Sequence, residues 1–185
     1  MRSSSESRPA NEPADQTETE PAADPVAVAR EIALRQLTVR QRTTSELAQA
    51  LARKNVPEAA ARQVLDRFTE VGLLDDAAYA RDWVASGSRR MKGRRVLAAE
   101  LAQKGVPAEL IEAALEQRTA DDDLAAALEL ARRKARGLTG LERQVQYRRL
   151  AGALQRRGFN WSVTAEVVGQ VLDDLSGDAD DAEQR

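Results

Sequence analysis

Arginine and lysine are the residues whose type and spacing most clearly indicate chemistry in this sequence. Positions 89 to 95 hold five basic residues and no acidic one, so nothing nearby in the chain neutralises them. Two further basic groups follow in the last third of the chain. Guanidinium and ammonium groups bind phosphate oxygens, and repeated backbone contacts gain from counterion release. The sequence therefore predicts a phosphate-binding surface formed by Arg89, Arg90, Lys92, Arg94, Arg95, Lys104, Arg132, Arg133, Lys134, Arg136, Arg148, Arg149, Arg156 and Arg157.

Each basic group taken singly also fits a solvated helix face whose cations complement a helix C-terminus. The presence of three such groups favours binding to phosphate over this alternative. Sequence-specific reading of bases has little support, because the helical joints recur as a repeat and no lone recognition helix stands out. Stacking on bases is limited as well, because the chain has only six aromatic residues and most of them lie at helical spacing with other apolar residues.

Acidic residues also cluster, at positions 121 to 123, where a metal or acid–base role has to be considered. Three adjacent carboxylates do not face one point on a helix, and they lie where a helix start favours negative charge. The chain has no histidine and no cysteine, which removes the commonest metal ligands and the usual general base. We therefore expect no metal, no cofactor and no enzymatic activity.

The formal net charge of −2 hides segments of opposite sign. Residues 1–25 hold six acids against two arginines, and residues 173–185 hold six acids against one arginine. The remaining residues, 26–172, hold 25 basic and 18 acidic side chains, a balance of +7 that favours a polyanionic partner. No apolar run approaches the roughly 20 residues of a membrane span, and no signal peptide is evident, so we expect a cytoplasmic protein.

The elements that position these cations are helices joined by short turns. In the stretch from Glu70 to Arg81, Gly72 is expected to end one helix in a left-handed cap, and Leu73 and Leu74 to pack back on that helix. Asp75 or Asp76 is expected to start the next helix, which runs to about Arg89. Valine at position 72 should destabilise this cap. Gly87 lacks the capping pattern and is expected to tolerate alanine better.

Three segments of the chain repeat the same pattern of residues that end one helix and start the next, at spacings of 50 and 53 residues. Residues 51–57, 101–107 and 154–160 each have a leucine, then a cation, then Gly or Asn suited to a helix C-cap, then the start of another helix. Three three-helix repeats are therefore predicted. The predicted organisation is a disordered acidic tail over 1–25, repeats over 26–72, 73–119 and 120–175, and an acidic C-terminal tail over 176–185.

The sequence resembles the RecX family of regulators of the RecA recombinase from about Val28 to Leu175. Four blocks carry the resemblance, over residues 40–47, 72–80, 93–106 and 154–159. The block Gly-Leu-Leu-Asp-Asp-Ala-Ala-Tyr-Ala at 72–80 is the most recognisable. Thr43 stands where the family usually has serine, Asn55 stands where a later repeat has Gly105, and the acidic tails are long.

The resemblance implies an all-α fold of three tandem three-helix, helix-turn-helix-like repeats in an elongated curved rod. It also implies a negative regulator that binds the RecA–DNA filament and inhibits its ATPase, extension and strand exchange. The expected partners are RecA and single- or double-stranded DNA, without a membrane, and the expected state is a monomer. Two alternatives remain open, a helical DNA-binding protein that acts without RecA and a helical-repeat scaffold for proteins alone.

Overall fold

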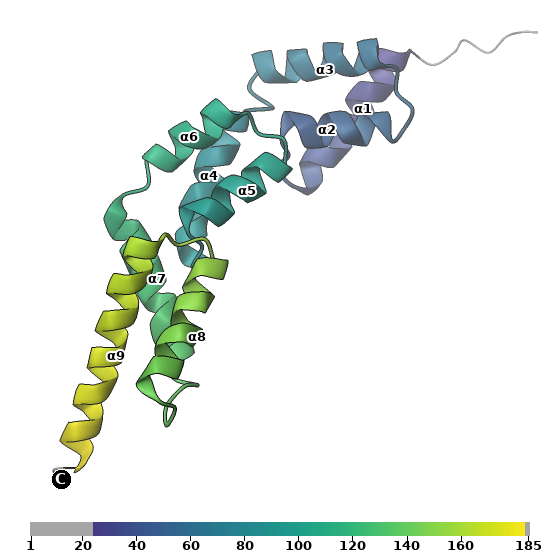
Figure 1. Cartoon of the computed structure of the whole chain (residues 1–185). Coiled ribbons are helices and arrows are strands. Elements are labelled where there is room, and N and C mark those ends of the chain that lie inside the picture. Colours follow the sequence, from purple (N-terminus) through teal and green to yellow (C-terminus); the bar gives the residue numbers. More distant parts are fainter. Residues whose placement is uncertain (1–23, 184–185) are drawn as a thin grey trace, which may run out of the picture.

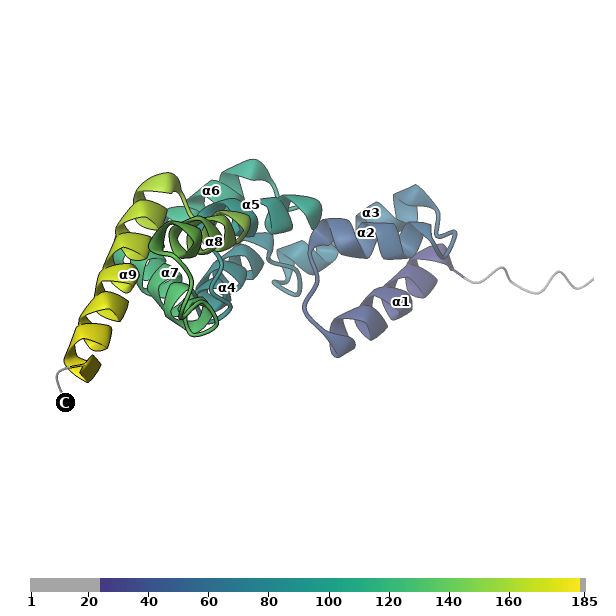
Figure 2. The same cartoon turned by 60° about the horizontal axis from the view of Figure 1, so that its bottom comes forward.

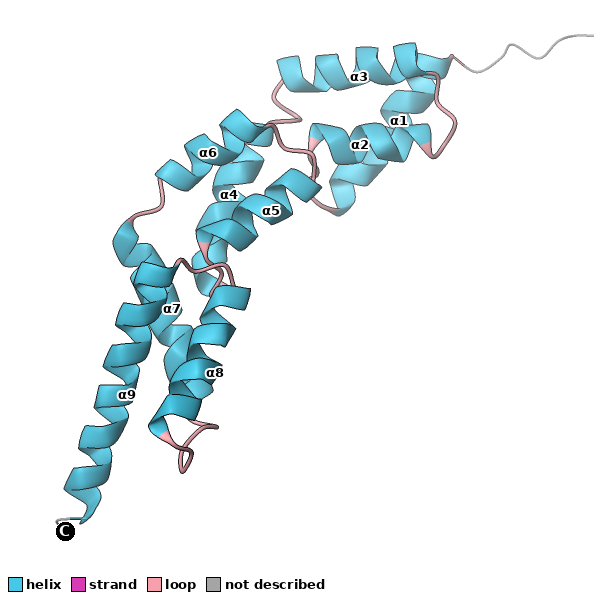
Figure 3. Cartoon of the chain, in the orientation of Figure 1, coloured by secondary structure: helices cyan, strands magenta, loops and turns pink. Residues whose placement is uncertain are grey.

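The computed structural model describes residues 24–183, and within that range every regular element is an α-helix (Figure 3). The helices in chain order are α1 (Pro25–Val39), α2 (Thr44–Ala52), α3 (Glu58–Glu70), α4 (Asp76–Arg89), α5 (Arg94–Gln103), α6 (Ala108–Glu116), α7 (Ala120–Ala135), α8 (Arg143–Arg156) and α9 (Trp161–Glu183). The prediction of an all-α fold is confirmed.

The helices pack in threes around three separate apolar cores. One core joins α1, α2 and α3, a second joins α4, α5 and α6, and a third joins α7, α8 and α9. The groups follow one another along an elongated, curved rod, with α1–α3 at one end and α9 at the other (Figures 1 and 2). In the view of Figure 1, the second helix of each group lies on the inner side of the curve and the third helix on the outer side.

The turn between the paired leucines and the next helix has the same backbone form in all three groups. Asn55, Gly105 and Gly158 have φ values of 57°, 74° and 87°, which is the left-handed conformation of a helix C-cap. The leucines before each cap, at positions 47 and 51, 97 and 101, and 150 and 154, are at most 1% exposed. The predicted repeated joint is therefore present, because the same local signals end the second helix of each group and anchor it in its core.

The joint at residues 70–81 also follows the prediction, with one difference. Gly72 has a φ of 72° and ends α3, and the Asp75 carboxylate accepts a hydrogen bond from the Ala78 N–H at the start of α4. Leu74 packs in the first core at 2% exposure, but Leu73 is 52% exposed. The prediction that both leucines pack back was wrong for Leu73, because consecutive residues in an extended turn point in opposite directions.

The geometry around Gly87 argues against the expectation that this residue tolerates alanine better. Gly87 is buried in α4 against α5, and a Cβ built there would lie 2.6 Å from Leu97 Cδ1. A Cβ at Gly72 would meet no atom within 4 Å, so only its positive φ disfavours a side chain. The close approach of α4 and α5 explains why position 87 is a glycine. A sequence pattern along one helix does not reveal such an approach.

The tails lie mostly outside the described residues. The predicted disorder of 1–25 concerns residues 1–23 that the structure does not describe, whereas Asp24 caps α1 and Pro25 begins it. The predicted C-terminal tail from 176 differs from the structure, in which α9 continues to Glu183. Among the described side chains of α9, Leu175 is the last that packs against the third core. We keep 26–72, 73–119 and 120–175 as proposed bounds of the repeats.

Candidate nucleic-acid interface

The second helix of the third group is strongly basic. Helix α8 contains four arginines and no acidic residue over its 14 residues. An open hollow of about 380 Å³ lies between this helix and the end of α7. The residues that line the hollow are Lys134, Leu138, Arg148, Arg149, Ala153 and Arg156, so it has four cations and no carboxylate. Nearby like charges raise the local potential, which favours a phosphate backbone.

Helix geometry brings two of these cations together. Arg149, Ala153 and Arg156 are four and three residues apart and follow one face of α8, and the small side chain of Ala153 leaves space between the two arginines. Lys134 reaches the same hollow from the last turn of α7. The four cations are exposed or line the hollow, and none forms an ion pair with a described side chain.

The other predicted cations of this group differ in their surroundings. Arg132 lies 3.5 Å from an Asp174 oxygen on α9, so it is already paired, although both side chains are exposed. Arg133 and Arg136 are exposed without an ion pair to a described side chain. Arg157 is half-buried at the C-cap of α8, where its carbonyl oxygen accepts a hydrogen bond from the Gly93 N–H at 2.8 Å.

The five cations at 89–95 do not form one free cluster. Lys92 pairs with Glu100 of α5, and Arg94 donates to Asp123 of α7 at 2.7 Å. Arg94 also donates to the Leu115 carbonyl oxygen at 2.9 Å. No acid within the segment neutralises these two residues, as the sequence indicates, but acids of other helix turns do. Their acidic partners lie 8 and 29 residues further along the chain, where local sequence does not reveal them.

Arg89, Arg90 and Arg95 remain exposed. The Arg90 guanidinium lies 4.6 Å from the centroid of the Trp83 ring, a cation–π contact that holds it on the surface of α4. Arg95 is the second residue of α5, and its N–H donates to the Gly158 carbonyl oxygen at 3.3 Å. This contact places the start of α5 beside the C-terminal end of α8. The side chain of Arg95 is exposed near this contact.

Lys104 serves the joint between the first two groups. Its Nζ donates to Glu46 Oε1 at 3.0 Å, and its carbonyl oxygen accepts from the Thr43 hydroxyl at 2.6 Å. Its Nζ also lies 4.8 Å from the centroid of the Trp83 ring. Burial of the Glu46 carboxyl would raise its pKa, but hydrogen bonds from Arg40 and Lys104 outweigh this and lower the pKa to about 2. Lys104 is therefore committed to a contact within the protein.

The acidic cluster at 121–123 divides between two structural roles. Asp122 completes a capping box with Thr119 at the start of α7, as expected for an acid in a first turn. Asp123 is buried and accepts hydrogen bonds from both Arg94 and Arg118. Among residues 24–176, whose side chains are described, no group of His, Cys, Asp and Glu could hold a metal ion.

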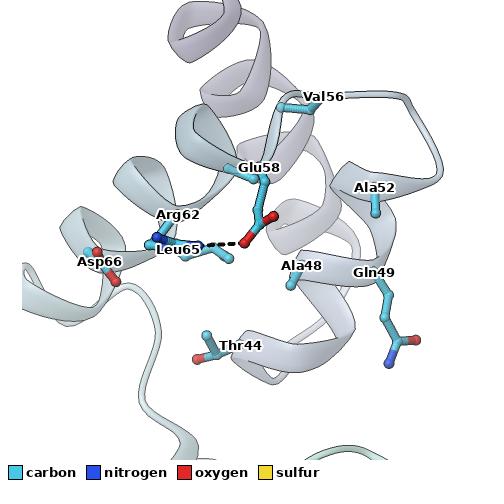
Figure 4. Close-up of a pocket in the computed structure, with 10 residues that line it drawn as sticks. Thr44, Ala48, Gln49, Ala52, Val56, Glu58, Arg62, Leu65 and Asp66 are labelled. Atoms are coloured by element: carbon cyan, nitrogen blue, oxygen red, sulfur yellow. Dashed lines mark hydrogen bonds and ion pairs between the residues drawn. The ribbon is translucent and has the colours of Figure 1, made fainter.

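The first group has a hollow of a different kind, between α2 and α3 (Figure 4). Its volume is about 670 Å³, and Ala48, Ala52 and Val56 are among its apolar lining residues. The only cation on its wall, Arg62, pairs with Glu58. Charge compensation makes this hollow a poor match for phosphate.

Arg143 is a residue of this region that the sequence analysis missed. It begins α8 and donates to the Asp173 carboxylate, to the Leu172 carbonyl oxygen at 3.1 Å and to Ser176 Oγ at 3.2 Å. These contacts tie the start of α8 to α9. No helix within the described part of the chain has an apolar stretch long enough to cross a membrane.

The fold and this surface define a class of protein: an all-helical chain of three tandem three-helix units with a basic surface on the last unit. Three family models match the chain, described as RecX first, second and third three-helix domains, over residues 29–68, 75–115 and 121–168. The chain belongs to the RecX family.

Curated relatives agree with the family models. A Regulatory protein RecX from Streptomyces coelicolor is 44% identical over 162 residues, which cover 87% of this chain and 86% of that protein. A Regulatory protein RecX from Thermobifida fusca is 40% identical and covers 81% of this chain and 82% of its own length. One from Mycolicibacterium smegmatis is 42% identical and covers 91% and 94%.

Solved structures show the same fold. The crystal structure of RecX from Lactobacillus salivarius superimposes with a TM-score of 0.76 at 21% identity, covering 83% of this chain and 99% of that one. A crystal structure of regulatory protein RecX superimposes with a TM-score of 0.73 at 27% identity, covering 78% of this chain and 73% of that one. The predicted family and the predicted fold of three tandem three-helix units are both confirmed.

Proposed function

We propose that the protein is a negative regulator of the RecA recombinase. In this proposal it binds the RecA–DNA filament and inhibits its ATPase, its extension and its strand exchange. Family membership supports a regulatory role, because the curated relatives carry the name Regulatory protein RecX. The proposed place of action is the cytoplasm, and the proposed acting form is a monomer.

One observation carries the proposal of DNA contact, namely the hollow lined by Lys134, Arg148, Arg149 and Arg156 without an opposing acid. A curved rod that presents this surface can follow a filament and contact DNA phosphates and RecA at the same time. Two linked contacts of this kind raise the affinity above that of either contact alone. We therefore expect binding to the filament to be tighter than binding to bare DNA.

The test uses the full chain with RecA and single-stranded DNA, and follows ATP hydrolysis. The variant replaces Arg148, Arg149 and Arg156 by alanine. A matched control replaces Arg30, Arg53 and Lys54, three exposed cations of the first repeat that form no ion pair with a described side chain. Both variants lose three charges. We expect the wild type and the control to inhibit RecA, and the α8 variant to need a higher concentration for the same inhibition.

Bare DNA provides the comparison with the first alternative. All four cations of the basic hollow belong to this chain, so the hollow can bind DNA without a second protein. A DNA-binding protein that acts without RecA therefore remains an alternative. That alternative predicts equal affinity for bare DNA and for the filament. Unchanged inhibition by a well-folded α8 variant would contradict the role proposed for the hollow. A wild-type chain without affinity for DNA would favour the protein scaffold instead.

A further inference from the structure

A buried arginine at the joint between the second and third groups has too few hydrogen-bond acceptors. Arg118 lies between α6 and α7, and its side chain is 2% exposed. Its Nε donates to Asp123 Oδ1 at 2.6 Å, but Nη1 and Nη2 have no partner among the described residues. A guanidinium stays charged in a protein, and unpaired buried donors cost free energy. This position therefore lacks acceptor atoms.

Two carboxylates lie near Arg118, but neither accepts a hydrogen bond from its Nη1 or Nη2. The Asp123 carboxylate is shared, because it accepts from Arg94 as well as from Arg118. The remaining donors of Arg94 bond to the carbonyl oxygens of Leu115 and Arg118, which are neutral. Two guanidinium groups thus share the Asp123 carboxylate, and the Asp122 carboxylate interacts electrostatically with both of them. The two buried Arg118 donors still lack an acceptor, which an anion would supply.

An open hollow of about 450 Å³ lies directly beside Arg118, between α4, α6 and α7. Arg81 and Arg89 of α4 line it together with Arg118, and both are exposed without an ion pair to a described side chain. Asp122 also lies on the wall, but its Oδ2 accepts the N–H and the hydroxyl of Thr119, each at 2.9 Å. The hollow therefore has an excess of cations.

We propose that this hollow binds a phosphate group between Arg81, Arg89 and Arg118. A phosphate has enough acceptor oxygens for several guanidinium groups, and arginine forks match its geometry. The Arg118 nitrogens are covered by neighbouring atoms, so the proposed binding requires side chains at the rim to move before a phosphate oxygen reaches them. None of the lining residues belongs to α8, which makes this site separate from the basic hollow and independent of the proposed function.

The first experiment measures thermal unfolding of the full chain in sodium phosphate and in sodium chloride at equal ionic strength. Phosphate binding to the folded protein is expected to raise Tm beyond the effect of chloride. Replacing Arg81 and Arg89 by alanine should weaken the phosphate affinity about tenfold or more, since charged hydrogen bonds are lost. The matched control, Arg30→Ala with Arg53→Ala, should retain the wild-type response. An equal response to phosphate and chloride in the wild type would overturn the proposal.

A second variant tests Arg118 itself. Arg118→Lys keeps the charge and can pair with Asp123, but it lacks the forked nitrogens, so it should fold and lose most of the phosphate response. If this variant does not fold, the variant with alanine at Arg81 and Arg89 is the only test of the site. A rise in its Tm with phosphate equal to that of the wild type would overturn the proposal.

The source of the phosphate is found by adding an oligothymidylate to the phosphate-bound protein and following the Thr119 amide resonance. Displacement of phosphate identifies a nucleic-acid backbone, and retention identifies free phosphate or a small phosphorylated molecule.

Discussion

Arg94 at the start of α5 donates to Asp123 of α7 at 2.7 Å, and this contact ties the second group of helices to the third. The sequence places Arg94 within a dense basic segment, which suggests a surface for phosphate. Its guanidinium instead forms contacts within the protein, because it also donates hydrogen bonds to carbonyl oxygens at the end of the second group. Local charge density alone therefore does not separate a binding cation from a structural one.

Replacing Arg94 by alanine should destabilise the protein, whereas replacing Arg95 should not. The Arg94 side chain is 39% exposed and Asp123 is 10% exposed, so solvent weakens the ion pair only in part. We expect a loss of about 1–3 kcal/mol in the free energy of unfolding, because carbonyl and carboxylate acceptors lose their donor. Arg95→Ala should remain within about 0.5 kcal/mol. Urea unfolding followed by circular dichroism measures both, and equal values would contradict the structural role.

Alanine at Gly87 should be more damaging than alanine at Gly72. The new Cβ would lie 2.6 Å from Leu97 Cδ1, and overpacking of this kind costs about 1–3 kcal/mol. At Gly72 the cost is a side chain at a φ of 72°, roughly 1 kcal/mol. Gly169→Ala in α9 is the control, since a Cβ there meets no atom within 4 Å and should stabilise the helix. Melting temperatures should rank Gly169→Ala highest and Gly87→Ala lowest.

The Glu46 carboxyl should make the joint between the first two groups sensitive to acid. Its pKa is lowered from 4.5 to about 2 in the folded protein, so its ionised form stabilises the fold above about pH 4.5. That contribution, on the order of 2 kcal/mol, is lost as the pH falls from about 4.5 to 2. Glu46→Gln should be less stable than the wild type at pH 6 and should lose less stability on acidification. Glu70→Gln, at an exposed carboxylate, should behave like the wild type.

Salt dependence should distinguish the basic hollow of α8 from the segment at 89–95. Replacing Arg148, Arg149 and Arg156 by alanine should reduce the slope of log affinity against log salt by up to about 0.7–0.9 for each lost phosphate contact. Replacing Lys92 and Arg94 should leave this slope nearly unchanged for the folded fraction of the variant. Glu100 and Asp123 already pair with these two cations, so they are not expected to contact phosphate. A salt titration of filament binding checks this, and the reverse order would refute the assignment of the hollow.

Local signals in the sequence were enough to predict the helices and their grouping into repeats. The caps depend on side chains within a few residues, such as Thr43 with Glu46, and on the left-handed backbone of Gly72, Gly105 and Gly158. The paired leucines predicted the cores because helical spacing puts them on one face. Short-range chemistry and periodicity therefore determined the secondary structure, the repeat and, through the family blocks, the fold.

The candidate site was predicted only in outline. The sequence indicated the basic groups, but the hollow depends on which face of α8 borders the end of α7 outside the third core, and only packing decides this. Lys92, Arg94 and Lys104 form ion pairs with carboxylates 8, 29 and 58 residues away in the chain. Gly87 has no side chain at the point where Leu97 of α5 packs closely against α4. These features are decided by the tertiary structure, because each depends on a contact between helices that no local pattern encodes.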